Sequence, residues 1–108
     1  MAITSTQTEH QVRNMAVGRY ISTGTAAAFK ITTGFKPRYV KVQNLAATGS
    51  TTEWYEGMTA AYAVKRVTAG DFTMPTSLGI TVAEDGFTVG LDIDLNVISE
   101  QLSWIAIG

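Results

Sequence analysis

The residues that could carry out chemistry are few, and their spacing suits no catalytic arrangement. His10 is the only histidine of the 108-residue chain, and it follows Glu9 in a polar tract. A catalytic triad needs an imidazole that a rigid scaffold holds in place. A zinc site needs three or four nitrogen or sulfur ligands, and the chain has no cysteine. We therefore expect His10 to be a solvated or interface side chain rather than a catalytic or metal-binding one.

One group of oxygen-bearing side chains could begin a calcium site. Asp92, Asp94 and Asn96 share one face at strand spacing, and calcium prefers such ligands. The calcium-binding loop that this spacing resembles needs a glycine at the sixth position and a glutamate at the twelfth. Val97 and Ser103 stand at those positions. We interpret the three residues as the polar face of a strand, and we predict no metal site.

The remaining carboxylates do not form a catalytic pair. A glycosidase sets two carboxyl groups across a cleft, whereas Glu53 and Glu56 would point to opposite faces of one strand. The run from Gly86 to Gly90 lacks the lysine of a phosphate-binding loop. We predict that the protein is not an enzyme and that it uses no cofactor.

Composition excludes several kinds of partner and favours another. The net charge is −1 with the basic residues scattered, so we expect no binding to nucleic acid. No apolar run reaches the length of a membrane span, and the amino terminus has no secretion signal, which predicts a protein made in a cytoplasm. The chain is 45% hydrophobic but only 16% charged. Such low charge predicts that a partner covers part of the surface.

The chain divides into an arm and one domain. Residues 1–11 contain a polar tract rich in Thr and Gln, and we expect an extended N-terminal arm that reaches a neighbouring molecule. From Val12 onward, short β-rich runs alternate with Gly, Thr and Ser, so residues 12–108 are predicted to be a single β-sandwich domain.

The periodicity predicts an all-β fold, a small β-sandwich or a jelly-roll-like barrel of about seven or eight short strands. Strands are expected at residues 12–23, 26–33, 38–45, 51–58, 72–76, 80–83, 87–91, 91–97 and 102–108, some of them continuous with one another. The second of these can pair with the first as a hairpin. Residues 59–67, rich in Ala, Lys and Arg, favour a helical turn or a loop.

Two glycines have specific expected roles. Gly18 interrupts the first strand, which indicates a bulge or a close contact. Gly86 follows Glu84 and Asp85 in the turn of the hairpin at residues 80–91, where we expect it to take the left-handed conformation.

Several segments carry large apolar residues on both faces. In the last strand, Trp104 points one way while Ile105 and Ile107 point the other, so this must be a central strand or lie under another subunit. Trp54 and Tyr55 likewise cannot face the same core. We expect subunit contacts at Ile3, His10, Trp54, Tyr55 and Met58. In a second interpretation, Trp54, Tyr55, Tyr39 and Tyr62 form a stacking platform for sugars.

Several runs together resemble a known class of virion protein. They are residues 34–44 (GFKPRYVKVQN), 53–58 (EWYEGM), 79–82 (GITV), 86–89 (GFTV) and 104–106 (WIA). These runs look like the small head decoration, or cement, proteins of tailed bacteriophages, although they contain structural residues and no active-site motif.

The resemblance implies a β-rich oligomer on the outer surface of the capsid of the virion, where it ties neighbouring capsomers together. The partner would be the major capsid protein. The two-faced apolar segments lead us to expect a homotrimer. The alternative function is a tail-fibre or receptor-binding module that recognises a host saccharide through exposed aromatics.

Overall fold

The computed structural model describes residues 14–21, 28–45, 49–67, 70–90, 95 and 100–108. These residues form nine strands and no helix. The strands are β1 (Met15–Ile21), β2 (Phe29–Thr32), β3 (Tyr39–Asn44), β4 (Thr51–Tyr55), β5 (Val64–Arg66), β6 (Phe72–Thr73), β7 (Ile80–Ala83), β8 (Gly86–Val89) and β9 (Gln101–Ile107). The predicted all-β fold is confirmed. The predicted arm, residues 1–11, lies outside the described residues.

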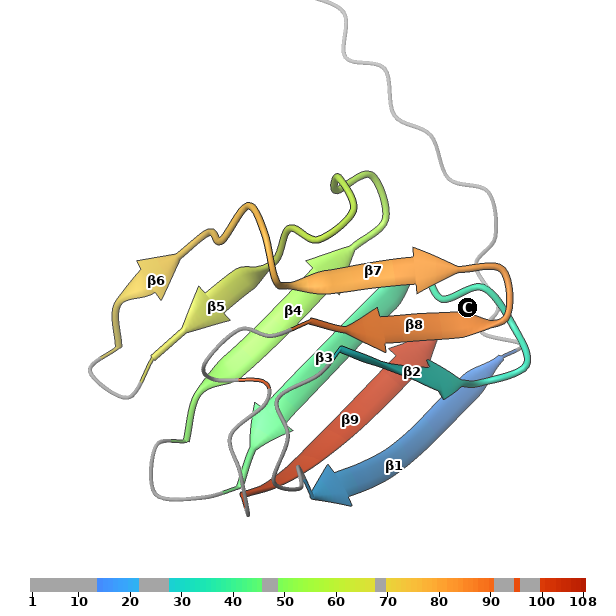
Figure 1. Ribbon diagram of the computed structural model, residues 1–108, viewed down its shortest axis with the longest axis horizontal. Coiled ribbons are helices and arrows are strands. Elements are labelled where there is room, and N and C mark those ends of the chain that lie inside the picture. Colours follow the sequence, from blue (N-terminus) through green and yellow to red (C-terminus); the bar gives the residue numbers. More distant parts are fainter. Residues whose placement is uncertain (1–13, 22–27, 46–48, 68–69, 91–94, 96–99) are drawn as a thin grey trace, which may run out of the picture.

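The strands form two antiparallel sheets that pack as a sandwich. The larger sheet has six strands in the order β1-β9-β3-β4-β5-β6, and the smaller has three in the order β2-β8-β7. Figure 1 shows the smaller sheet in front of the larger one, with its strands crossing those of the larger sheet obliquely. The larger sheet therefore has one face covered by the smaller sheet and one face directed away from it.

The core lies between the sheets because alternate residues of each strand point inward. The rings of Phe87 and Trp104, one from each sheet, meet edge to face within it, with centroids 5.4 Å apart. The buried core residues are Val40, Val42, Trp54, Ile80, Phe87, Val89, Leu95, Leu102, Trp104 and Ala106. The larger sheet contributes most of them, from β3, β4 and β9.

Gly18 lies where the Trp104 ring crosses β1. The two residues are ladder partners, and a Cβ atom on Gly18 would lie 2.6 Å from Cζ2 of Trp104. Of the two expected roles for Gly18, the structure shows the close contact: this glycine leaves the space that the indole occupies.

Strand β9 is a central strand, as its two apolar faces predict. It pairs with β1 on one side and with β3 on the other, both antiparallel. Leu102, Trp104 and Ala106 are buried, while Ile105 and Ile107 on the opposite face are half-buried. The smaller sheet covers the inner face of β9, where its buried residues pack against Ile80, Phe87 and Val89. The outer face is covered only in part, by side chains of the neighbouring strands.

The predicted pairing of the first two strands is wrong. Strand β2 pairs with β8 in the smaller sheet, where Phe29 and Ile31 pack against the core. In that position β2 helps to cover the inner face of the larger sheet. Pairing with β1 would instead have added β2 to the edge of the larger sheet and left that part of its inner face uncovered. The Tyr20 ring meets Phe29 edge to face at 4.8 Å, so β1 and β2 touch across the sandwich.

Two other predictions change in detail, and a third falls on residues that are mostly not described. Residues 59–67 contain β5, because pairing with β4 outweighs the helical preference of Ala, Lys and Arg. The hairpin of β7 and β8 is confirmed, but Gly86 is not among the residues with a positive φ. Its lack of a side chain serves a close approach of β2 instead. The strand predicted at residues 91–97 falls mostly outside the described residues, and Leu95 lies in a turn.

Candidate interaction surface

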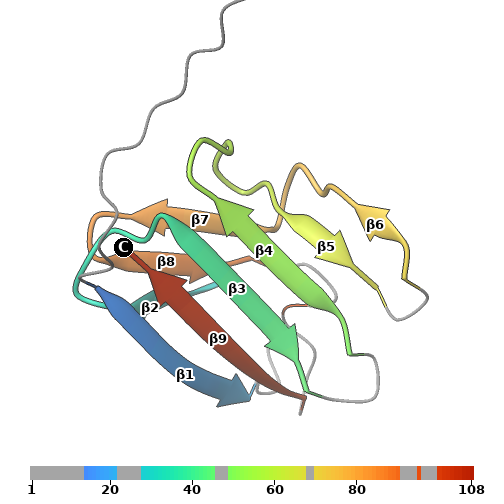
Figure 2. The ribbon, with the colours of Figure 1, turned by 180° about the vertical axis from the view of Figure 1, so that it is seen from behind.

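The face of the larger sheet that points away from the smaller sheet, here called the outer face, has no other described element over it (Figure 2). Alternation along the strands and the ladder registers fix its members. They are Met15, Val17, Arg19 and Ile21 of β1; Ser103, Ile105 and Ile107 of β9; Tyr39, Lys41 and Gln43 of β3; Thr51, Glu53 and Tyr55 of β4; Val64 and Arg66 of β5; and Phe72 of β6.

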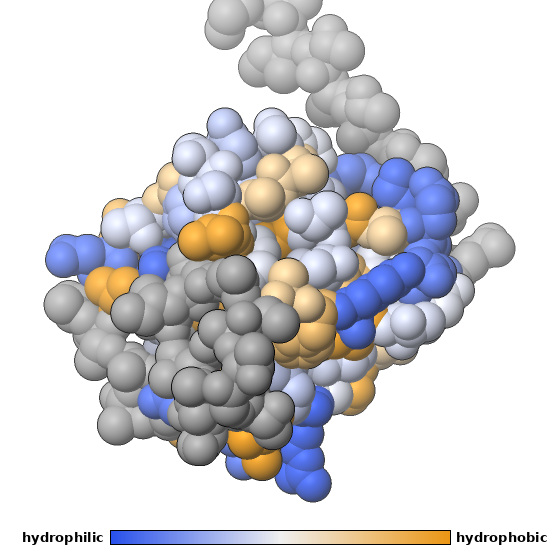
Figure 3. Space-filling view, in the orientation of Figure 1, coloured by the Kyte–Doolittle hydropathy of each residue, from blue (hydrophilic) through white to orange (hydrophobic). Residues whose placement is uncertain are grey.

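One end of the outer face is apolar and accessible. Met15 is 61% exposed, Val17 64% and Ile21 58%, and the ladder places Met15 beside Ile107 and Val17 beside Ile105. A sheet face that meets only water normally carries polar side chains. Contiguous apolar residues on such a face mark an interaction site. The side of the sandwich over the smaller sheet shows hydrophilic and hydrophobic residues intermixed (Figure 3).

The middle of the outer face is polar and hydrogen-bonded. The hydroxyls of Tyr39 and Tyr55 both donate to Oε2 of Glu53, at 2.5 and 3.2 Å. The two tyrosine rings lie 5.3 Å apart and tilted by 58°. Lys41 is the ladder partner of Glu53 on the neighbouring strand. Glu53 is therefore an oriented carboxylate with a cationic side chain on the adjacent strand.

The same contacts change the acidity of the tyrosines. Burial raises the pKa of Tyr39, and the hydrogen bond to Glu53 and its charge raise it further. The pKa of Tyr55 is raised by the same causes, of which partial burial is the largest. Both phenols therefore stay protonated, as donors, well above neutral pH.

Replacing Glu53 with glutamine is expected to lower the pKa of both tyrosines, because a neutral amide no longer disfavours the phenolate. Both pKa values should stay above the ordinary tyrosine value, since burial remains. Tyr20 is the internal control, because burial alone raises its pKa. NMR titration of the tyrosine rings measures all three. An unchanged pKa for both Tyr39 and Tyr55 would contradict the observed hydrogen bonds.

The predicted contact residues fall in different places. Trp54 points inward and is 7% exposed, so it belongs to the core, whereas Tyr55 points outward. The prediction that these neighbours face opposite sides is confirmed. Met58 packs against the core, and its sulfur lies 3.2 Å from the backbone nitrogen of Tyr55. Ile3 and His10 lie outside the described residues.

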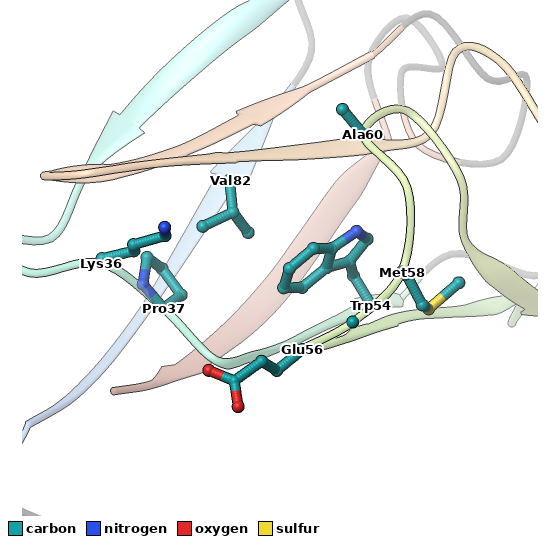
Figure 4. A pocket seen from close by; sticks show the side chains of 8 residues that line it. Lys36, Pro37, Trp54, Glu56, Met58, Ala60 and Val82 are labelled. Atoms are coloured by element: carbon teal, nitrogen blue, oxygen red, sulfur yellow. The ribbon is translucent and has the colours of Figure 1, made fainter.

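Trp54 also forms one wall of a small pocket of about 300 Å³. The indole ring points toward Val82 and Pro37, and the Glu56 carboxylate is directed away from Val82 (Figure 4). The lining residues are Lys36, Pro37, Trp54, Glu56, Gly57, Met58, Ala60 and Val82. Among the charged residues of this lining, Lys36 pairs with Glu84 at 3.6 Å. Among the described residues, the lining contains no serine, threonine, cysteine or histidine, and its ionisable side chains are Lys36 and Glu56.

The described residues contain no cluster of three or more His, Asp or Glu side chains that could hold a metal ion. Asp92, Asp94 and Asn96 lie outside the described residues. Nor do the described ranges contain a helix that is long and apolar enough to span a membrane. The exposed apolar side chains of Met15, Val17 and Ile21 make the outer face the main candidate for function in the part of the chain that the structure describes.

Two features of the outer face were not predicted. No role was expected for Lys41 or for the Glu53 hydrogen bonds, because these depend on the register between β3 and β4. The apolar residues of β1 did carry a signal, since Met15 and Val17 alternate with Ala16 and Gly18. The alternation alone could not say that the larger residues point outward.

Comparison of the chain with protein-family models, with curated proteins and with solved structures finds no match.

Proposed function

We propose that the protein is a bacteriophage structural protein that binds the outer surface of the capsid and stabilises the mature head. The observation that carries this proposal is the accessible apolar end of the outer face, at Met15, Val17 and Ile21. A surface of this kind is typical of a protein that works in contact with other proteins, whether capsid subunits or further copies of itself. The resemblance of residues 34–44 and 53–58 to cement proteins supports the choice of a virion.

The mechanism would be mechanical. A decoration protein adds contact area between neighbouring capsomers, and it stabilises the expanded lattice by binding that state in preference to others. Its partner would be the major capsid protein, and it would reach the virion surface after synthesis in the host cytoplasm. Several weak contacts suffice for attachment. Once one copy of an oligomer is bound, the linked copies are held near the capsid at a high effective concentration, which raises the overall affinity.

Deleting residues 1–11 tests the attachment part of the proposal. The polar arm cannot pack a core, but it can pair with a sheet edge or lie in a groove of a neighbour. The free energy of unfolding of the free protein should change by less than about 1 kcal/mol. Occupancy on undecorated expanded heads should fall in a binding titration, measured against the full-length chain.

A matched control replaces the arm with a Gly-Ser sequence of equal length, which keeps the chain length and removes the side chains. Equal affinity of all three forms would contradict the role of the arm. Unfolding of the shortened protein would instead place the arm within the sandwich as a strand.

A second candidate is a tail-fibre or receptor-binding module that holds a host saccharide. It is favoured by the exposed Tyr55 ring, tilted against Tyr39 beside the Glu53 carboxylate, since aromatic rings and carboxylates suit sugar faces and hydroxyls. Trp54, in the core, is not available for stacking. A glycan array separates the two candidates: a specific glycan signal that Tyr55→Ala abolishes would favour the saccharide-binding module.

A further inference from the structure

The outer face has a symmetric pattern of polarity across its six strands. Its polar centre lies on β3 and β4, at Lys41 and Glu53. On one side of this centre, β9 and β1 carry Ile105 and Val17. On the other side, Val64 of β5 is the ladder partner of Glu53, and β6 carries the exposed Phe72. Apolar side chains thus flank the charged pair on both sides.

We propose that the outer face packs against the same face of a second copy of this chain, about a two-fold axis that runs along the strands between β3 and β4. The inference rests on the proposed function in one respect, the expectation that the protein works as an oligomer, and it assigns a two-fold dimer in place of the expected homotrimer. Its test uses the free protein, so a failure to pair and a failure to bind heads are distinguishable.

Charge complementarity selects this axis. A two-fold axis between β3 and β4 places each outward-facing residue of β3 over the residue of the other copy's β4 that is its ladder partner within one chain. Lys41 then lies over the partner's Glu53, and Glu53 over the partner's Lys41. An axis through β3 itself would place the two lysines over each other. Lys41 makes no ion pair with a described residue within its own chain, so its charge is available for this contact.

The flanking strands match under the same axis. Strand β9 lies over the partner's β5, which brings Ile105 near the partner's Val64. Strand β1 lies over the partner's β6, which brings Arg19 near the partner's Phe72. That ring already has a guanidinium, that of Arg66, 5.9 Å from its centroid within one chain. Under the same axis Arg66 of β5 lies over the partner's Ser103 of β9. Each arginine therefore faces an aromatic ring or a serine of the other copy, and not another arginine. Sheets in sandwiches cross at about 30°, so the match is closest near the axis.

The area available indicates a weak but specific contact. Six strands about 4.8 Å apart and about five residues long cover roughly 400–500 Å² in projection, and side-chain relief makes the accessible area larger. A stable interface buries about 800 Å² per partner. The outer face reaches this area only if most of it is buried in the contact between the two copies. Pairing should therefore depend on protein concentration and on the central charges.

Charge reversal tests the arrangement. Sedimentation equilibrium over a range of concentrations should show dimers of the parent chain. Lys41→Glu and Glu53→Lys should each weaken dimerisation at least tenfold, because each places like charges over each other. An equimolar mixture of the two variants should dimerise again, since every facing pair then has opposite charges. The double variant should dimerise like the parent.

Lys36→Glu is the control, because it reverses a lysine away from the outer face and should leave association unchanged. Circular dichroism checks that each variant is folded. If one variant is less stable than the parent, recovery of dimerisation in the mixture still shows that the charges, and not the loss of stability, prevented pairing. A parent that stays monomeric at millimolar concentration would overturn the proposal. So would a trimer that the reversals do not affect, or single variants that dimerise as well as the parent.

Discussion

Replacing Leu102 with alanine is expected to lower the free energy of unfolding by about 2–5 kcal/mol, the range for large-to-small substitutions in a close-packed core. Leu102 has no exposed surface and belongs to the core cluster. It comes from a strand held on both sides, so the backbone cannot move in to fill the cavity. A domain of this size has a total stability of about 5–15 kcal/mol, which makes the loss severe.

Leu45→Ala is the matched control. Leu45 follows β3, and its amide donates to the carbonyl of Gln101, the residue before Leu102, at 2.9 Å. The two leucines are thus close along the sheet, yet Leu45 is 54% exposed. Its replacement should change the free energy of unfolding by less than about 0.5 kcal/mol. Denaturant unfolding measures the free energy of unfolding of both variants. Equal losses for Leu102→Ala and Leu45→Ala would contradict the burial of Leu102 in the core.

Gly86→Ala is expected to destabilise the protein by about 3 kcal/mol, at the upper end of the range for overpacking. A Cβ atom on Gly86 would lie 2.1 Å from the carbonyl oxygen of Ile31. That oxygen belongs to the backbone of β2, which cannot turn aside as a side chain can. The end of β2 is also tied to the turn, because the Thr33 amide donates to the Asp85 carbonyl at 2.9 Å.

The sign of the change in the free energy of unfolding distinguishes a close contact at Gly86 from its absence. Without the contact, Ala in place of Gly would stabilise by about 0.4–1 kcal/mol, because it restricts the unfolded chain. Thr88→Ala, two residues further along the same strand at a partly exposed position, is the control and should have little effect. Stabilisation by Gly86→Ala would show that β2 does not pack against β8 at this point.

The sequence predicted those parts of the fold that depend on neighbours along the chain. The hairpin of β7 and β8 was predictable because two alternating runs flank a turn at Glu84 and Asp85. The central position of β9 followed from apolar residues on both of its faces. The opposite orientation of Trp54 and Tyr55 followed from strand geometry alone.

The features that were not predicted depend on contacts between distant segments. Strand β2 pairs with β8, more than fifty residues away, and no local pattern encodes that choice. Residues 64–66 became a strand because β4 offered an edge to pair with. The cluster of Tyr39 and Glu53 requires the register between β3 and β4, which the loop between them sets. The choice of Trp54 over Tyr55 for the core was likewise decided by the smaller sheet.

The most direct test of the proposed function is the copy number of the protein in purified virions of a phage that encodes it, measured by quantitative mass spectrometry against the major capsid protein. A decoration protein repeats over the capsid lattice, so the account predicts hundreds of copies per particle, in a fixed ratio to the capsid protein. Only a few copies per particle would indicate a tail-fibre component, and absence from the virion would contradict a structural role in the head.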